Sequence, residues 1–204
     1  MIDNIIKGVL LIAIVVLAYF VFESIAGKIR FDEEAKRRRN VTIERLKDIR
    51  AAQLAYKEVK KEFANTFDAL LNFITHDSLP VIKAIGTVPD TLTEEDAVKM
   101  GIVRRDTIMV SARDSIFSPT YLKNRITKFY LDSLPYIPYS GGKQFTIQAG
   151  EIERGKVRVK VFEVFGAFMD IYSGLDFSNE DIDSDTGLKV GSMTEPSVAG
   201  NWGE

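Results

Sequence analysis

The chain has 204 residues, of which 46 % are apolar and 27 % are charged, and its formal net charge is −2. Basic and acidic residues nearly balance, so the chain lacks the positive field that nucleic-acid binding requires, and we expect no nucleic-acid partner. The absence of cysteine excludes disulfides and thiolate metal sites, and any fold must depend on its own core.

The first predicted element is a membrane-spanning helix within residues 1–27. The run GVLLIAIVVLAYFVFESIAG, from Gly8 to Gly27, contains one charged residue, Glu23. A helix of about 20 residues is about 30 Å long, which matches the hydrocarbon core of a bilayer. The alternative is a signal peptide cut before Gly27, with the small residues Ser24 and Ala26 at the cleavage site. The start MIDNIIK has a single lysine and is a poor secretory leader, so we expect an anchor.

A long amphipathic helix is predicted next, within a helical stalk over residues 28–76. The stretch KIRFDEEAKRRRN contains no proline, so nothing stops the helix at the membrane interface. An apolar stripe then recurs at alternating spacings of three and four residues, formed by Ile49, Ala52, Tyr56, Val59 and Phe63. The stripe either packs on its own domain or forms an intermolecular coiled coil. It lasts barely two heptads, whereas coiled coils need three or more.

The remaining elements predict a small β-rich head over residues 77–175 and a polar, turn-rich tail over 176–204. A short helix from Phe67, capped by Thr66 and limited by Pro80, precedes the head. The runs PVIKAIGTVPD and DTIMVSARD read as strands around a helical turn, TEEDAVKMG, and residues 121–134 read as a helix. The run KQFTIQAGEIERGKVRVKVFEV is the clearest antiparallel strand pair. The expected fold class is α+β, with the membrane helix continuing into the amphipathic helix and packing on the antiparallel head.

This order of elements resembles the pseudopilins of type II secretion and the type IV pilins. The segment IRAAQLAYKEVKKEFANTFDALLNF is similar to the end-of-helix segment of that family, and Asn201-Trp202 is similar to the C-terminal end of major pseudopilins. The family's Gly-Phe-Thr-Leu-x-Glu processing junction is absent, because Lys7-Gly8 is followed by neither the aromatic residue nor the glutamate. The resemblance implies a pilin-like structural protein, and the missing junction predicts that it stays anchored.

The orientation of the head is predicted in opposite directions by two signals. Six Lys or Arg residues lie between Lys28 and Arg39 and one, Lys7, precedes the span, so the positive-inside rule places the head in the cytoplasm. Five Asp-Ser/Thr-apolar tripeptides, against about one expected by chance, resemble the O-glycosylation signal of one group of Gram-negative bacteria, which is used outside the cytoplasm. The modified residues would be Ser78, Thr91, Thr107, Ser115 and Ser133, on exposed loops.

The same tripeptides also have an ordinary structural interpretation, because Asp-Ser and Asp-Thr start turns and caps. We favour a head in the periplasm of a bacterial inner membrane, attached by a single membrane helix.

Catalysis is not expected from the residue inventory. The one histidine, His76, lies beside Asp77 at the end of the short helix, where a histidine more often caps the helix than acts as a base. Gly141-Gly142 precedes a strand and lacks the spacing of a phosphate loop. We therefore expect no enzyme and no organic cofactor.

Two functions remain. One is a structural or assembly component that contacts other membrane helices, protein subunits or further copies of itself. The other is a membrane-tethered binding, accessory or sensor module with the long helix as a stalk. Glu23 is a candidate interaction residue, as is the apolar stripe, because an acid near the end of a span is costly unless it is paired or lies at the interface. A Lys or Arg supplied by a partner helix would favour the assembly role.

A calcium site in the tail is the last hypothesis. Asp181, Asp183 and Asp185 alternate like the first three ligands of a calcium loop. The EF-hand spacing fails, because Thr186 takes the place of the loop glycine and Ser192 that of the final glutamate. Major pseudopilins bind calcium in a C-terminal loop, so the resemblance implies a calcium ion here. The alternative is a solvated acidic turn.

Overall fold

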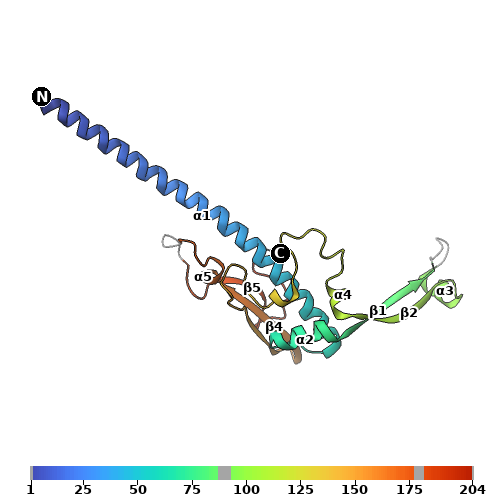
Figure 1. The fold of residues 1–204 in the computed structure, drawn as a ribbon. Helices are drawn as coiled ribbons and strands as arrows, with labels where there is room; N and C mark the ends of the chain where they lie inside the picture. Colours follow the sequence, from blue (N-terminus) through green and yellow to red (C-terminus); the bar gives the residue numbers. More distant parts are fainter. Residues whose placement is uncertain (1, 87–92, 177–181, 204) are drawn as a thin grey trace.

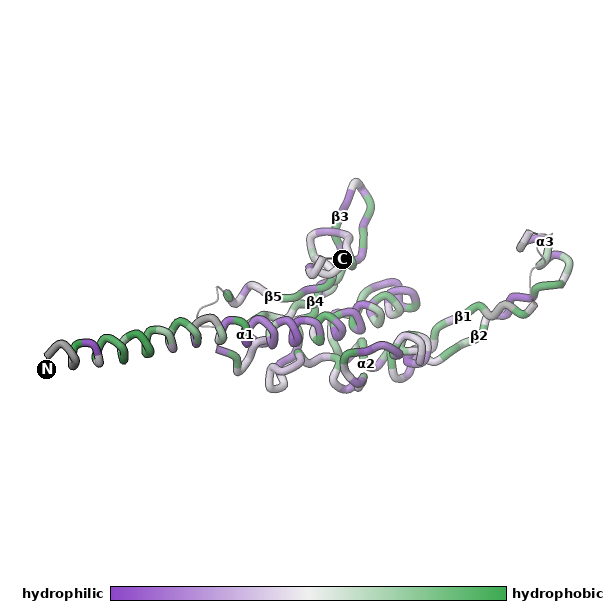
Figure 2. The backbone as a smooth tube through the Cα atoms, turned by 90° about the horizontal axis from the view of Figure 1, so that it is seen from above, coloured by the Kyte–Doolittle hydropathy of each residue, from purple (hydrophilic) through white to green (hydrophobic). Residues whose placement is uncertain are grey.

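The computed structural model describes residues 2–86, 93–176 and 182–203, and its main feature is one long helix. Helix α1 (Ile2–Lys60) runs for 59 residues without interruption. Its N-terminal part, which includes residues 6–23 and which we call the free part, stands away from the rest of the chain (Figure 1). Its second part lies within the head. Figure 2 shows that the free part is mainly hydrophobic and the part within the head mixed. The predicted continuation of the helix beyond Gly27 is confirmed.

The core of the head forms around the second part of α1. Ile49 and Ala52 are fully buried. The Tyr56 ring packs edge-on against Phe73 of α2 (Phe67–His76), with ring centroids 5.1 Å apart. Phe63, just beyond the end of α1, lies 4.6 Å from the Phe162 ring. The apolar stripe therefore packs on its own domain, and within this chain it is not exposed as a coiled-coil seam.

The reversal of the chain between α1 and α2 is held by side-chain hydrogen bonds. The buried Gln53 amide donates to the Ala64 carbonyl at 2.8 Å and accepts from the Ala64 N–H at 2.9 Å. Thr66 caps α2 by accepting from the Ala69 N–H at 3.2 Å, as predicted. These contacts fix the direction in which α2 packs back on α1.

A three-stranded antiparallel sheet packs against α1 through one of its edge strands. Its strands are β3 (Thr146–Arg154), β4 (Val157–Ala167) and β5 (Gly187–Gly191), in the order β3-β4-β5, and β5 lies against α1. The predicted strand pair is confirmed as the β3–β4 hairpin. Strand β5 lies within the segment expected to be a polar tail, and its Leu188 and Val190 side chains are buried. The tail thus supplies an edge strand of the sheet, with apolar side chains in the core.

A second, two-stranded sheet forms a projecting hairpin that we call the arm (residues 78–86 and 93–111). It consists of β1 (Ser78–Ile85), α3 (Glu94–Lys99) and β2 (Arg104–Ser111), and β1 pairs with β2. The arm leaves the head at the end of α1 that lies far from the free apolar part (Figures 1 and 2). The two predicted strands and the helical turn between them are confirmed.

Short elements complete an α+β fold. These are α4 (Ala112–Ile116), η1 (Leu131–Ser133) and α5 (Phe168–Ile171). The helix predicted over residues 121–134 is wrong, because only the 3₁₀ turn η1 forms there. The backbone N–H groups of residues 126 and 127 instead donate to the Glu44 side chain of α1.

Candidate functional site

The free part of α1 is the first candidate surface. Within the described residues it belongs to the one helix that is long and apolar enough to cross a membrane. All side chains from Ile6 to Glu23 are exposed, which is costly in water for so apolar a run. Glu23 accepts a hydrogen bond from Arg30 of the same helix at 2.5 Å, and both side chains are exposed. The acid near the end of the span is therefore paired within its own chain and requires no cation from a partner helix.

The segment that follows joins α1 directly to the head. The Glu34 carboxylate accepts hydrogen bonds from Arg37 at 2.7 Å and Arg38 at 2.9 Å, and these bonds lower the pKa of Glu34 to about 2. Arg38 also donates to the backbone carbonyls of Ser173 at 2.8 Å and Ile171 at 3.3 Å, next to α5. The head is thus attached to α1 within about three helical turns of the predicted span.

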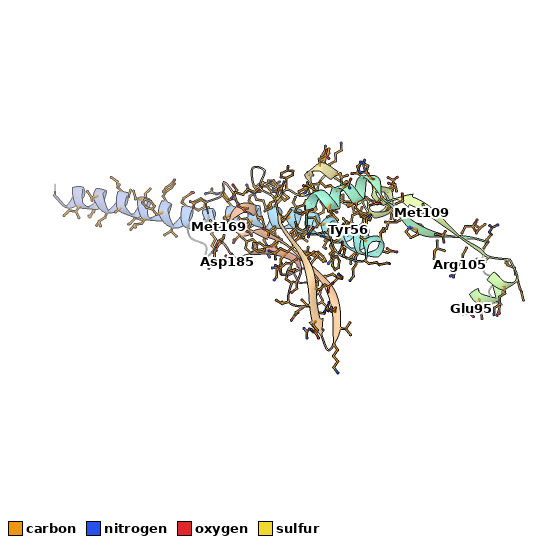
Figure 3. The ribbon with its side chains drawn as sticks, turned by 90° about the horizontal axis from the view of Figure 1, so that it is seen from below. Tyr56, Glu95, Arg105, Met109, Met169 and Asp185 are labelled. Carbon is orange, nitrogen blue, oxygen red and sulfur yellow. The ribbon has the colours of Figure 1, made fainter. Side chains whose placement is uncertain are left out.

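The arm is the second candidate surface, because it exposes many large apolar side chains. Val81 pairs with Ile108 across the two strands, and Pro80 pairs with Met109. The exposed large apolar residues of the arm are Val81, Ile82, Ile85, Met100, Ile102, Ile108 and Met109. Figure 3 shows Met109 toward the base of the arm, with Arg105 and Glu95 nearer its tip. A two-stranded hairpin is marginal in water by itself, and an apolar patch of this kind marks a contact surface.

A buried charge cluster, which we call the Asp48 cluster, holds residues 117–130 against α1. The fully buried Asp48 carboxylate accepts two hydrogen bonds from Arg125, both at 2.7 Å, and one from the Tyr121 hydroxyl at 3.1 Å. Glu44 accepts from the backbone N–H groups of residues 126 and 127, at 2.8 and 3.2 Å. Burial raises the pKa of Asp48, and the hydrogen bonds and charge of Arg125 oppose that rise.

The polar groups of the Asp48 cluster bond mainly within the cluster. Its carboxylate oxygens accept from the Arg125 guanidinium, from backbone N–H groups and from the hydroxyls of Tyr121 and Thr127. Burial and the neighbouring Asp48 raise the pKa of the Tyr121 hydroxyl, so this group keeps its proton. Sequence reasoning missed the cluster, since Asp48 and Arg125 are 77 positions apart. The signal in the sequence was Asp48 itself, next to Ile49 on the apolar side of an amphipathic helix, because a carboxylate buried there needs a charged or hydrogen-bonding partner.

His76 lies where the sequence placed it. It is the last residue of α2, its side chain is exposed, and its Nδ1 lies 3.2 Å from the Asn72 carbonyl oxygen. This position at a helix C-terminus fits the capping interpretation. A catalytic role has no support from its surroundings.

The candidate glycosylation residues do not lie on loops, so that expectation is wrong for the four that are described. Ser78 begins β1, Thr107 lies within β2, Ser115 belongs to α4 and Ser133 to η1. Thr107 is exposed and the other three are half-buried. Thr91 lies outside the described residues. The modification itself stays a prediction, and Thr107 is the described residue most accessible to it.

The predicted calcium ligands are placed only in part. Asp181 lies outside the described residues, and Asp183 and Asp185 are exposed in the turn before β5. The Asp183 carbonyl accepts from the N–H of Thr186 at 3.1 Å and from its hydroxyl at 2.8 Å. Among the residues that the structure describes, no group of three or more acidic or histidine side chains could hold a metal ion. The calcium site stays a prediction.

Comparison of the chain with family models, curated proteins and solved structures found no match.

Proposed function

We propose that the chain is a single-pass, membrane-anchored, non-catalytic structural or assembly subunit of the bacterial cell envelope. Its architecture is pilin-like, its head faces the periplasm, and it acts through contacts of the helix and the head with other subunits. The observation that carries this proposal is that one uninterrupted helix provides both the candidate membrane span and the centre of the folded core.

The continuous helix sets the height and orientation of the head above the bilayer. Phe31, which packs against the core, lies four residues beyond Gly27 and so about 6 Å further along α1. No flexible linker separates the two parts, since α1 extends to Lys60. A rigid connection of this kind fixes the position of the head relative to the membrane. Such a fixed position is useful to a subunit that must contact its neighbours, and it gives no advantage to a catalytic domain that acts on diffusing substrates.

The arm supplies the surface for such contacts. It leaves the head at the end remote from the membrane helix, and it carries seven exposed large apolar residues on a hairpin of only two strands. Subunits anchored in the same bilayer by the same kind of helix present their arms at equal height. We therefore propose that the arm contacts another anchored subunit, with a further copy of this chain as the simplest partner.

The alternative role, a membrane-tethered binding or sensor module, is favoured by one observation. Glu23 is paired with Arg30 of its own helix, so the span has no unsatisfied charge that calls for a partner helix. Helix–helix contacts in the membrane are then unnecessary, and α1 would serve as a stalk. The two roles differ in what the arm touches in the native membrane.

Site-specific photocrosslinking in native membranes separates the two roles. A photoreactive amino acid at Met109, which is 67 % exposed, should give one adduct of defined mass with another membrane-anchored subunit. The matched control is Val157, which is 60 % exposed at the β3–β4 hairpin and outside the arm. Similar adducts at both positions, or none at Met109, would contradict the assembly role.

Membrane attachment and orientation are tested separately. The intact chain should stay in the membrane fraction after an alkaline carbonate wash, because the free part of α1 lies in the bilayer. A reporter enzyme that is active only in the periplasm, fused after Glu204, should be active. An inactive reporter would place the head in the cytoplasm, as the positive-inside rule does.

A further inference from the structure

A groove of about 690 Å³ lies between α1 and the segments that pack against its membrane-proximal half, and we call it the juxtamembrane groove. One wall is aromatic. Phe31 of α1 packs edge-on against Tyr172, with centroids 5.7 Å apart, and Tyr172 stacks on Phe168 at 5.4 Å. Met169 and Asp185, sequence neighbours of two lining residues, lie where the free part of α1 enters the head (Figure 3).

Trp202 forms another part of the groove, next to a residue that is attached to β5. The neighbouring Asn201 accepts from the Lys189 N–H at 3.0 Å and donates to the Gly187 carbonyl at 2.9 Å, which attaches the C-terminal segment to β5. The indole ring lies over Gly200, where an added Cβ would come within 2.2 Å of the ring. The Trp202 indole N–H is buried and has no acceptor among the described residues. A residue that lines the groove thus has a buried donor that the described residues leave unsatisfied.

Two cations that line the groove have no carboxylate partner among the described residues. Arg30 is paired with Glu23, and Arg37 and Arg38 are paired with Glu34, as described above. Lys36 and Arg39 line the groove and form no ion pair with any described residue. The Arg39 guanidinium lies 5.8 Å from the centroid of the Phe168 ring, so it is placed over the aromatic wall. Among the described residues of the lining, Asp32 is the one that is acidic.

The position of the groove along α1 brings it to the membrane surface. Lys36 lies nine residues beyond Gly27, or about 14 Å along the helix. Long side chains on a helix lean toward its N-terminus, which carries the ammonium group back toward the bilayer. The headgroup layer is about 5–8 Å thick on each side. The membrane-facing end of the groove is therefore within reach of lipid headgroups.

We propose that the juxtamembrane groove binds the phosphate headgroup of an anionic phospholipid from the bilayer that holds α1. Lys36 and Arg39 neutralise the phosphate, the Trp202 N–H donates to a headgroup oxygen after a small displacement of the ring, and the aromatic wall contacts the glycerol and first methylene groups. The inference rests on the proposed membrane anchoring.

Lipid fits the groove better than a free phosphate ion. A free ion could use the same cations and donor, but it would leave the aromatic wall empty. A lipid fills that wall, and the anchor keeps protein and lipid in the same surface at high effective concentration. Aromatic and basic residues are the usual protein groups at a membrane interface. Two basic residues near a charged surface, at about 1 kcal/mol each, correspond to about a 30-fold preference for anionic lipid.

The intrinsic fluorescence of Trp202 reports on the groove directly, because it is the only tryptophan of the chain. The full chain is placed in nanodiscs of phosphatidylcholine with a small fraction of brominated lipid, either phosphatidylglycerol or phosphatidylcholine. We expect brominated phosphatidylglycerol to quench Trp202 at about 30-fold lower mole fraction than brominated phosphatidylcholine. Lys36→Gln/Arg39→Gln should abolish this difference. The control Arg113→Gln/Lys123→Gln removes two exposed cations outside the groove and should keep it.

Four outcomes would overturn the inference. Equal quenching by the two lipids, or a preference that survives Lys36→Gln/Arg39→Gln, would reject the groove as an anionic-lipid site while leaving the anchor intact. Inorganic phosphate or glycerol phosphate that displaces brominated phosphatidylglycerol at low millimolar concentration would identify a free anion as the ligand. Failure of the chain to enter nanodiscs would reject the anchor, and the lipid site with it.

Discussion

Removing Arg125 should destabilise the head by leaving a buried carboxylate without its counter-charge. In Arg125→Met, Asp48 loses both hydrogen bonds of 2.7 Å and keeps the Tyr121 hydroxyl as a donor. Removing one partner of a buried ion pair costs about 3–5 kcal/mol. At about 2–4 °C per kcal/mol for a domain of this size, the midpoint of thermal unfolding should fall by about 10 °C.

The loss should also depend on pH. Burial already raises the pKa of Asp48, and Arg125 opposes that rise, so its removal raises the pKa further. The folded variant then binds a proton more tightly than the unfolded chain does. Its stability should therefore fall as the pH rises from the unfolded pKa of Asp toward the folded pKa. The variant should be closest to the parent in acid and furthest from it in mild alkali.

Circular dichroism melts of the full chain in detergent, at pH 5 and pH 8, measure both effects. Limited proteolysis with subtilisin should in addition show faster cleavage within residues 117–130. Lys123→Met, an exposed change in the same segment, is the control and should stay within about 0.5 kcal/mol of the parent. Asp48→Leu/Arg125→Met removes both charges and should recover most of the stability, because an apolar pair can replace a buried ion pair.

Two results would refute this reasoning. A midpoint for Arg125→Met equal to that of Lys123→Met would show that the Asp48 cluster does not hold the segment. A double variant no more stable than Arg125→Met would show that the orphaned carboxylate is not the cause of the loss.

Three further predictions follow from other sites. Hydrogen bonds from Arg37 and Arg38 lower the pKa of Glu34 to about 2, so the contribution of Glu34 to stability is present above pH 4.5 and should be lost as the pH falls toward 2. In Glu34→Gln the midpoint of thermal unfolding should therefore change less with pH over that range than in the parent. Gly200→Ala places a Cβ 2.2 Å from the Trp202 ring and should cost about 1–3 kcal/mol in urea unfolding, with a red-shifted tryptophan emission. If calcium binds the tail, millimolar calcium should raise the unfolding midpoint and Asp183→Asn/Asp185→Asn should abolish that rise, whereas a midpoint equal in chelator and calcium would reject the site.

The elements that sequence reasoning predicted well are those whose signal is local. The continuous α1 follows from an apolar run joined to an amphipathic stripe without proline, and α2 from the Thr66 cap. The β3–β4 hairpin follows from alternating residues around a turn in which Gly155 and Lys156 both have positive φ. Each of these depends on residues only a few positions apart, so the pattern and the structure agree.

The elements that were missed depend on partners far away in the sequence. Residues 121–134 carry a helix-like pattern, yet the backbone N–H groups of residues 126 and 127 bond to Glu44, 82 and 83 positions earlier, in place of helical hydrogen bonds. Strand β5 has the composition of a turn, and it forms because β4 and α1 offer Leu188 and Val190 a place to be buried. The juxtamembrane groove likewise brings together α1 and the C-terminus, and no local spacing indicates it.

The unbroken course of α1 also has a mechanical consequence. Lys60 lies 33 residues beyond Gly27, a length of about 50 Å. Membrane helices tilt by about 20° on average, and the tilt follows the match between the apolar length and the bilayer thickness. With no joint between the span and the head, such a tilt displaces the far end of α1 sideways by about 17 Å. A thinner or thicker bilayer would therefore change how far the arm reaches across the membrane surface, and with it which neighbours it meets.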